Sequence, residues 1–421
     1  MGIVVLGAGI VGITTAYRLA RNGHKVTVID RQPGPALEAS FANAAQIAAA
    51  LSGPWAAPGV PGQMLDWMRR ADSPMRFRLK ADHRQWLWGL RFLAECRRDR
   101  FETTFRRMLE FGQYSQKMLA GVKQETGLAY DQLEKGILKL CTTPETVADL
   151  ADFEAILQRA EIPARRLSAE EAIALEPALE PVRGRLAACL HLPTDESGDA
   201  HLFARGLAER CVALGVDFRY GHDISDIELH RGEILSVRTD KGEIGGELFV
   251  LALGSHSPQL ARKLGLSLPV YPVKGYSATV PVGGPVGDSN GAPRVSLYIA
   301  EKKVAMSRLG DRLRIAGMAD IAGYDLTLEQ ARARQVLEAG LSLFPAIDGG
   351  RAEFWCGLRP LTPDGLPILG SCKVPNLLLN TGHGTYGWTY ACGSAQVIAD
   401  LVTGRTPDHD LSGMTLSRFG W

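Results

Sequence analysis

Three glycines and one acid near the N-terminus have the residue types and the spacing that bind a dinucleotide. Gly7, Gly9 and Gly12 form a Gly-x-Gly-x-x-Gly pattern, and Asp30 follows at the usual distance of about 20 residues. In such a pattern the first glycine makes a tight turn, the second lets the backbone approach a pyrophosphate, and the third lets a helix pack closely on a strand. The acid can hold ribose hydroxyls, which favours an adenosine with a free 2′-OH. A purely structural glycine turn is the alternative.

The residues around this pattern have the order of a complete β-α-β unit. The apolar run 3–6 is typical of a buried parallel strand, and residues 14–22 have helical spacing. Gly23 ends this helix, and a second strand follows over 25–29. The pyrophosphate would rest on the helix N-terminus, where free N–H groups favour negative charge. Because strand, glycines, helix, strand and acid follow in register, the sequence predicts dinucleotide binding.

Composition limits the classes of protein to consider. The 421 residues give room for two or three domains, and the formal net charge of +1 gives no overall nucleic-acid-binding footprint. Seven cysteines are dispersed without a Cys-x-x-Cys spacing, which indicates buried free thiols in a reducing cytoplasm and no metal site. The N-terminus lacks signal-peptide features, and no apolar run reaches the roughly 18 residues needed to cross a bilayer. We therefore expect a cytoplasmic protein that is soluble or lies on a surface.

A segment rich in arginine, residues 66–107, also carries Trp67, Trp86 and Trp88. A basic, tryptophan-bearing helix can lie on an anionic membrane, which would place the protein peripherally on the inner face of the cell membrane. The alternative is a solvated helix whose tryptophans face the protein core, and the two interpretations are compatible.

Two further segments could meet a planar cofactor. Residues 38–47 are mostly small or carry amides, and Ser40, Asn43 and Gln46 could supply hydrogen bonds; the start of an ordinary helix is the alternative. A second glycine-rich loop, 381–389, precedes a helix over 391–403. Its glycines allow backbone N–H groups to reach a bound ring, and the helix dipole would stabilise negative charge there.

The remaining pattern predicts two groups of strands. Strands over 216–220, 224–229, 234–239 and 248–253 form a meander that returns to an apolar strand before Gly254. Ile224 would then lie near an adenine, unless it is a plain core residue. Strands over 270–276, 296–300, 303–308 and 313–318 predict an antiparallel sheet as a second layer over a ligand. Helices are expected from residue 83 onward and over 113–126, 144–160, 201–214 and 326–343.

Five segments resemble the D-amino-acid oxidase superfamily of FAD proteins, and within it most closely the bacterial D-amino acid dehydrogenase small-subunit type. They are residues 7–12 with Asp30, 40–47, 271–276, 357–368 and 382–389. The last three are much more specific than the glycine pattern, and the similarity spans the chain. Two residues depart from the pattern: Ala45 stands where glycine is expected, and Tyr386 where the dehydrogenases usually carry leucine.

The resemblance implies a mixed α/β fold with noncovalently bound FAD. A Rossmann-like FAD-binding domain of the glutathione-reductase/DAO type would comprise residues 1–80, 182–268 and 350–421. A substrate-binding domain of the α+β class, with an antiparallel sheet, would comprise residues 81–181 and 269–349.

The resemblance also implies oxidation of a D-amino acid at Cα to an imino acid, which water converts to a 2-oxo acid and ammonia. Electrons would pass to a quinone or another non-oxygen acceptor, such as an electron-transfer partner. The alternatives are a D-hydroxyproline or D-proline dehydrogenase, an oxidase acting on glycine or sarcosine, and a non-catalytic FAD-containing subunit of a larger complex. The oxidase-like Tyr386 leaves substrate size and acceptor open, and the sequence gives neither the preferred D-amino acid nor the oligomeric state.

The substrate carboxylate needs a fixed cation, and Arg359 is the best candidate because its planar fork can pair with a carboxylate bidentately. A structural ion pair is the alternative. Tyr276, rather than Tyr271, is expected to add a hydrogen bond, unless it is a core tyrosine. Lys274 and Arg308 are weaker candidates for cofactor or acceptor contacts, and His383 is expected to be structural rather than a general base.

The expected site therefore has two parts. The residues expected to act on the substrate are Arg359, Tyr276, Tyr271 and Tyr386. The residues expected to bind the cofactor are Gly7, Gly9, Ile10, Val11, Gly12, Asp30, Arg31, Ser40, Asn43, Ala44, Gln46, Ile47, Ile224, Ala252, Gly254, Gly357, Gly382, Gly384, Thr385, Gly387, Trp388 and Thr389.

Overall fold

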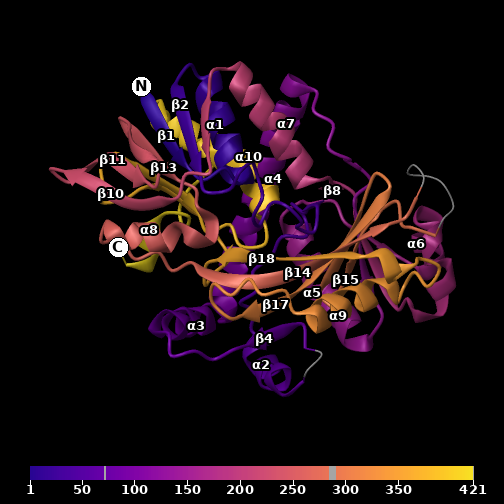
Figure 1. The fold of residues 1–421 in the computed structure, drawn as a ribbon. Coiled ribbons are helices and arrows are strands. Elements are labelled where there is room, and N and C mark those ends of the chain that lie inside the picture. Colours follow the sequence, from indigo (N-terminus) through magenta and orange to yellow (C-terminus); the bar gives the residue numbers. More distant parts are fainter. Residues whose placement is uncertain (71–72, 284–290, 421) are drawn as a thin grey trace.

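The apolar run near the N-terminus forms the centre of a six-stranded sheet (Figure 1). The structure, a computed structural model, describes residues 1–70, 73–283 and 291–420. In sheet order the strands are β19 (Ile368–Ser371), β20 (Leu377–Thr381), β13 (Leu248–Leu251), β1 (Gly2–Leu6), β2 (Lys25–Asp30) and β9 (Asp217–Tyr220). All neighbours are parallel except β19 and β20. The predicted β-α-β unit is confirmed.

Both faces of this sheet are covered, which explains why β1 is apolar throughout. Ile3 and Val5 pack into one core beneath α1 (Ile10–Arg21), α7 (Ala200–Ala213) and α10 (Gly387–Val402), with α4 (Arg98–Thr126) against α10. Val4 and Leu6 pack into a second core beneath the three-stranded sheet of β10 (Ile224–His230), β11 (Glu233–Thr239) and β12 (Gly242–Gly245). Of the four strands expected to form one meander, only the middle two lie in this sheet, because the first and last are β9 and β13 of the six-stranded sheet. Helix α8 (Ser257–Lys263) contributes to the same core.

A nine-stranded sheet forms the second layer of the molecule (Figure 1). Its path is β18 (Glu353–Leu361), β14 (Tyr271–Pro281), β17 (Arg312–Ile321), β16 (Val304–Leu309), β15 (Ser296–Ile299), β5 (Ile137–Cys141), β7 (Ala188–Leu192) and β6 (Arg165–Leu167), and β4 (Met75–Phe77) pairs with β17. The antiparallel pairing expected for the strands that form β14, β15, β16 and β17 is confirmed. Strands β5 and β4 add the parallel pairs β15–β5 and β17–β4, so the sheet as a whole is mixed.

Helix α9 (Gln330–Leu341) covers the outer side of this second sheet, where it packs on β14 and β17. Helix α5 (Pro144–Arg159) packs near β5 on the cavity side, in a core that it shares with α4. The remaining described elements are α2 (Val60–Arg69), α3 (His83–Glu95), α6 (Ala169–Leu175), the strand pair β3 (Gln46–Ile47) and β8 (Glu196–Ser197), and 3-10 helices over Pro177–Arg185, Gly254–His256, Gly349–Arg351 and Leu416–Phe419.

Several expected boundaries differ from the structure. Residues 98–126 form one continuous helix, and α10 begins at Gly387, so the end of the glycine-rich loop is already helical. Strands β4, β7 and β18 lie within the ranges expected for the cofactor domain, yet all three pair within the nine-stranded sheet. We propose that the division between the two domains follows sheet membership, with β4, β7 and β18 on the substrate side.

Candidate cofactor and substrate site

A cavity of about 980 Å³ is lined by loops of the six-stranded sheet and by strands of the nine-stranded sheet. It brings together segments from the whole length of the chain, including Gly7, Asp30, Ile224 and Arg359. Most of the residues expected to bind a cofactor line it. Three do not: Gly12, Ile47 and Gly382. Tyr271, expected at the substrate, does not line it either.

The glycines at the start of α1 have separate structural roles. Gly7 has φ of 111°, and a Cβ atom there would lie 2.5 Å from the carbonyl oxygen of Ala252. A Cβ at Gly12 would lie 1.9 Å from the carbonyl oxygen of Gly7, so Gly12 is needed for helix–strand packing. A Cβ at Gly9 would meet only Ser40 Oγ, at 3.8 Å. The backbone at Gly9 is therefore open toward the cavity, as a pyrophosphate requires.

Asp30 is held at the end of β2 by two backbone N–H groups. Ala8 N donates to Oδ2 over 2.6 Å and Gln32 N donates to Oδ1 over 2.8 Å. Burial raises the pKa of this carboxyl, and the two N–H groups oppose that effect. A carboxylate has about four lone-pair sites, so Asp30 keeps acceptor capacity for ribose hydroxyls.

The loop over residues 38–47 uses its polar side chains mainly to hold itself in place. Ser40 Oγ accepts from Ile10 N over 3.1 Å, and Asn43 Oδ1 accepts from Ala45 N over 2.9 Å. Gln46 Nε2 donates to Ser296 Oγ over 2.9 Å, which ties the loop to β15. The structure thus gives these three residues positioning contacts within the protein, and they line the cavity as expected.

Ala45 has a backbone conformation that explains why glycine is expected there. Its φ is 57°, in the left-handed region that L-residues other than glycine rarely adopt. We expect Ala45→Gly to raise the free energy of unfolding by about 1 kcal/mol, because relief of the left-handed strain exceeds the added entropy of the unfolded chain. Urea unfolding of the two proteins would check this, and a decrease in stability would contradict it.

The C-terminal loop is fixed by His383. Its Nε2 lies 2.8 Å from Ser394 Oγ, and burial lowers the pKa of the imidazole to about 3. His383 is therefore neutral near pH 7 and engaged with α10, which agrees with a structural role. Gly384 N donates to the carbonyl of Pro360 over 2.9 Å, which joins this loop to the end of β18.

One polar atom of this loop is left for a ligand. Within the described part of the chain Thr385 Oγ1 is buried without a hydrogen-bond partner, and Thr385 lines the cavity. Gly387, Trp388 and Thr389, the first turn of α10, line it as well. First-turn N–H groups have no partner within the helix, so this end of the cavity favours a ring that carries negative charge.

Arg359 lies on β18 with its guanidinium spread over the neighbouring strands. Nη1 donates to the carbonyl of Met318 over 2.8 Å and Nη2 donates to the carbonyl of Gly317 over 3.4 Å. A Cβ at Gly275 would lie 2.2 Å from Nη1, so the guanidinium occupies the space that this glycine leaves. The Trp55 ring centroid lies 5.9 Å from the guanidinium carbon.

The surroundings of Arg359 suit a bound anion. No carboxylate within the described ranges forms an ion pair with it, so the structural ion pair considered from the sequence is absent there. Burial lowers the pKa of the guanidinium to about 10, which still leaves it charged at pH 7. A guanidinium has five N–H donors, and the two main-chain contacts leave others for a ligand.

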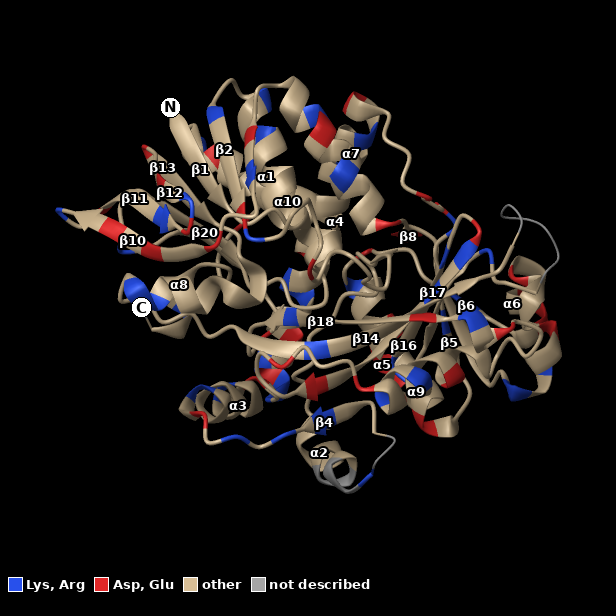
Figure 2. Cartoon of the chain, in the orientation of Figure 1, with Lys and Arg blue, Asp and Glu red and all other residues tan. Residues whose placement is uncertain are grey.

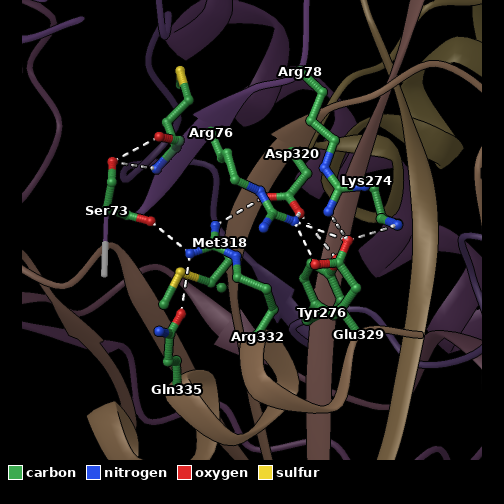
Figure 3. Close-up of polar contacts among 12 residues, drawn as sticks. Ser73, Arg76, Arg78, Lys274, Tyr276, Met318, Asp320, Glu329, Arg332 and Gln335 are labelled. Atoms are coloured by element: carbon green, nitrogen blue, oxygen red, sulfur yellow. Dashed lines mark hydrogen bonds and ion pairs between the residues drawn. The ribbon is translucent and has the colours of Figure 1, made fainter. Parts of the chain in front are cut away.

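The tyrosines expected beside Arg359 need a correction. Tyr276 lines the cavity, but its hydroxyl donates to Asp320 Oδ2 over 3.0 Å, among the side chains of α9 (Figure 3). Tyr271 donates over 3.4 Å to Asp82 Oδ2 and packs near Trp88. Since both hydroxyl groups are engaged elsewhere, we assign neither to the substrate.

The two weaker candidate cations are also placed away from the cavity, which neither of them lines. Lys274 Nζ donates to Asp325 Oδ2 over 3.2 Å and to the carbonyl of Thr327 over 2.9 Å. It also lies 3.8 Å from Glu329 Oε1 (Figure 3). Arg308 is buried on β16, where Nε donates to the carbonyl of Gly310 over 3.0 Å.

Tyr386 does reach the cavity. Its hydroxyl accepts from Gly53 N over 3.1 Å and lies 3.2 Å from the carbonyl of the same residue. Burial raises the pKa of this phenol to about 12, so Tyr386 is neutral. It connects the C-terminal loop to residues 48–54, and its ring borders the space next to Tyr298.

Some lining residues were not expected from the sequence. They include Trp55, Tyr298, Trp355 and a floor of small residues on the nine-stranded sheet: Gly275, Ala305, Ala316 and Gly317. One feature of the sequence could have indicated these residues, namely glycine and alanine within predicted strands. Glycine inside a strand often marks a place where a ligand approaches the backbone closely.

The comparisons with known proteins agree with this geometry. The family model described as FAD dependent oxidoreductase, DAO, matches residues 2–401. The chain belongs to this family. Within the DAO family, the protein named D-amino acid dehydrogenase from Rhizobium rhizogenes is 44% identical over 420 residues, which cover 100% of both chains. The protein of the same name from Paramagnetospirillum magneticum is 47% identical over 429 residues, covering 100% of this chain and 99% of its own.

Solved structures show the same fold. Glycine oxidase from Geobacillus kaustophilus superposes with a TM-score of 0.75 at 24% identity, over 99% of this chain and 98% of its own. L-proline dehydrogenase from P. horikoshii superposes with a TM-score of 0.74 at 19% identity, over 99% and 97%.

FAD is the cofactor of this family, and the residues present fit it. The open backbone at Gly9 suits the pyrophosphate, Asp30 the ribose, and the unpartnered Thr385 hydroxyl with the start of α10 the flavin end. Among residues 1–70, 73–283 and 291–420, no group of three His, Cys, Asp or Glu side chains could hold a metal ion.

Proposed function

We propose that the protein is an FAD-dependent D-amino acid dehydrogenase, which oxidises the substrate at Cα to an imino acid that water converts to a 2-oxo acid and ammonia. The observation that carries the proposal is Arg359, a buried guanidinium without a carboxylate partner among the described residues, in the same cavity as the cofactor residues. Relatives that match the whole chain carry the name D-amino acid dehydrogenase.

The protein's own part in the reaction is to place the substrate. Arg359 pairs with the α-carboxylate, and Tyr386 closes the cavity beside it with a neutral phenol. FAD, when bound, supplies the acceptor for the hydride from Cα. The substrate amine loses its proton to solvent, because His383 is engaged with Ser394 and is neutral.

The test is anaerobic mixing of the purified flavoprotein with D- and L-amino acids and with imino acids such as D-proline. Bleaching of the flavin by D-amino acids, followed by slow reoxidation in air and rapid reoxidation by a quinone, is the expected result. Rapid reoxidation in air would favour an amine oxidase, and bleaching by D-proline or D-hydroxyproline alone would favour that narrower dehydrogenase. No bleaching by any of these compounds would favour a non-catalytic FAD subunit.

We propose that the electron acceptor is a quinone in the membrane, because the exposed surface of α3 suits contact with a membrane. No helix in the described ranges is long and apolar enough to cross a bilayer. However, α3 exposes a stripe of large apolar side chains, with Leu79 just before the helix. We call Leu79, Trp86, Leu87, Leu90 and Leu93 the α3 stripe; their exposed fractions are 60, 52, 47, 65 and 40%.

The two interpretations of the tryptophan-rich segment concern different residues of it. Trp88 and Phe92, on the inner side of α3, are buried against β14, and Trp88 Nε1 donates to the carbonyl of Leu361 over 2.9 Å. Trp86 is on the exposed side, and the exposed Arg84 lies on the same helix. Residues 71–72 of the segment lie outside the described residues. An exposed apolar stripe with basic neighbours is the pattern of a helix that lies in a membrane interface.

We expect the double variant Leu87→Glu with Leu90→Glu to reduce sedimentation with anionic phospholipid vesicles by about tenfold or more. The variant loses apolar surface that the membrane would bury, and it adds negative charge that anionic lipids repel. Leu235→Glu, at an exposed leucine of β11, is the matched control and should bind as the parent protein does. Bleaching by D-alanine should be unchanged in both. Equal sedimentation of the double variant and the parent would contradict the membrane contact.

A further inference from the structure

The cavity continues past Tyr298 into an arm. The residues that we assign to the α-carboxylate and to the cofactor lie outside this arm. This arm, which we call the lysine arm, lies under β5, β15 and α5 and is lined by Lys139, Thr146, Asp149, Phe153, Ala300 and Lys303. Figure 2 places β5 between β16 and β6 in the second sheet, on the side of the molecule away from α3.

The register of the sheet connects the lysine arm to the active site. Lys139 is paired with Tyr298 across the β5–β15 ladder, so the two side chains leave the same face of the sheet. Tyr298 lies near Tyr386, whose phenol borders the flavin end of the cavity. Neighbouring strands are about 4.8 Å apart, so Lys139 stands one strand beyond the residues that border the substrate.

Lys139 is a cation in apolar surroundings. Its Nζ is 4.0 Å from the ring centroid of Phe153, whereas Leu138 and Leu140, its neighbours on β5, pack on the other face of the sheet. Its side chain has no ion pair or hydrogen bond to any residue that the structure describes. Burial lowers the pKa of the ammonium to about 8, which leaves it mostly protonated at pH 7.

Lys303 approaches the same arm from the turn between β15 and β16. It has φ of 53°, a left-handed conformation that costs free energy in a residue other than glycine. Lys303 is exposed at the mouth of the arm, and its ammonium likewise has no partner in the described part of the chain. Asp149, an exposed residue of α5, faces both lysines without forming an ion pair, and Asp152 and Arg159 of the same helix also line the cavity.

The two ammonium groups line one cavity and form no ion pair with the described residues, so their N–H donors are available to an anionic ligand. We propose that Lys139 and Lys303 bind the side-chain carboxylate of the substrate, so that the enzyme prefers D-amino acids with an acidic side chain of the length of glutamate or longer. The α-carboxylate pairs with Arg359 at one end of the cavity, and the second carboxylate meets the lysines at the other. This inference rests on the proposed function, because it concerns the substrate of the same site.

The test compares kcat/KM for D-glutamate, D-glutamine and D-alanine in the parent enzyme and in two variants, Lys139→Met and Lys303→Met. D-glutamate and D-glutamine have nearly the same shape but differ in side-chain charge. In the parent enzyme we expect D-glutamate to exceed D-glutamine by about tenfold or more, the range of a charge-assisted hydrogen bond. Each variant should lower kcat/KM for D-glutamate by about tenfold or more and leave D-alanine within twofold.

Two controls separate charge from folding. Lys302→Met alters the neighbouring exposed lysine, which does not line the cavity, and should leave the ratio of D-glutamate to D-glutamine unchanged. Lys139→Arg keeps the positive charge and should retain most of the preference. The flavin content of each variant reports whether it is folded. The ratio of kcat/KM for D-glutamate to that for D-glutamine is measured on one variant at a time, so a difference in the amount of folded protein does not change it.

The outcomes also separate this inference from the proposed function. Flavin reduction by D-alanine but not by L-alanine supports the proposed function whatever D-glutamate does. A parent enzyme that uses D-glutamine as well as D-glutamate, or lysine variants with an unchanged ratio, would overturn the acidic subsite. Absence of reduction by every D-amino acid would overturn both.

Discussion

Arg359→Ala is expected to lower kcat/KM for D-amino acids by about 10²- to 10⁴-fold, since two charge-assisted hydrogen bonds to the α-carboxylate are lost. Most of the effect should appear in KM, because the carboxylate is bound in the ground state as well as in the transition state. FAD should remain bound, since the cofactor residues described above lie mainly on other loops. Steady-state kinetics with D-alanine, together with the flavin-to-protein ratio, checks both statements.

Two further variants define the role of Arg359. Arg359→Lys keeps a positive charge without the planar fork, so it should recover only part of the lost activity. Arg351→Ala, at an exposed residue just before β18, is the matched control and should behave as the parent enzyme. An unchanged KM for Arg359→Ala would remove this residue from the substrate site and with it the main support for the proposed function.

The part of the site that could be predicted from sequence is the part fixed by local geometry. Gly7, Gly9 and Gly12 are spaced along one turn and one helix, and Asp30 ends the very next strand, so their relation does not depend on the rest of the fold. The C-terminal loop was found for the same reason. Its glycines directly precede α10, so sequence order and spatial order coincide.

The orientation of residues on the second sheet could not be predicted in this way. Every residue of β14 from Tyr271 to Ala278 is buried, because the cofactor cavity lies on one face and α9 on the other. A strand that is buried on both faces shows no alternation of polar and apolar residues, so the sequence does not tell which tyrosine faces the ligand. Tyr276 was expected at the substrate and instead bonds to Asp320.

The lysine arm depends on contacts that are still more distant in sequence. Residues 137–140 pair in parallel with residues 296–299, and only this pairing brings Lys139 beside Tyr298. Lys303 lies in the turn that follows the second of these strands. No local sequence pattern marks either lysine. Their availability to a ligand depends on which side chains surround them in the folded protein, and the sequence does not show this.

Asp320→Ala is expected to lower the free energy of unfolding by about 3–5 kcal/mol, the cost of leaving a buried cation unpaired. Asp320 is fully buried on β17 behind the Arg359 site (Figure 3). Its Oδ1 accepts from Arg332 Nη2 of α9 over 2.8 Å, and its Oδ2 accepts from Arg76 of β4 and from Tyr276 of β14. One carboxylate thus joins three elements of the protein.

Further variants can show how much of the stability lost in Asp320→Ala comes from the unpaired charge of Arg332. Arg332 is only 2% exposed, so in Asp320→Ala its charge remains buried and without its carboxylate. The double variant with Arg332→Met removes that charge, and it should lose less stability than the sum of the two single variants. Asp217→Asn is the control. Asp217 pairs with Arg219, and both side chains are about half exposed, so loss of this ion pair should cost about 1 kcal/mol or less. Urea unfolding of the holoenzymes measures all four proteins, and simple additivity of the two single variants would show that Asp320 and Arg332 are not coupled.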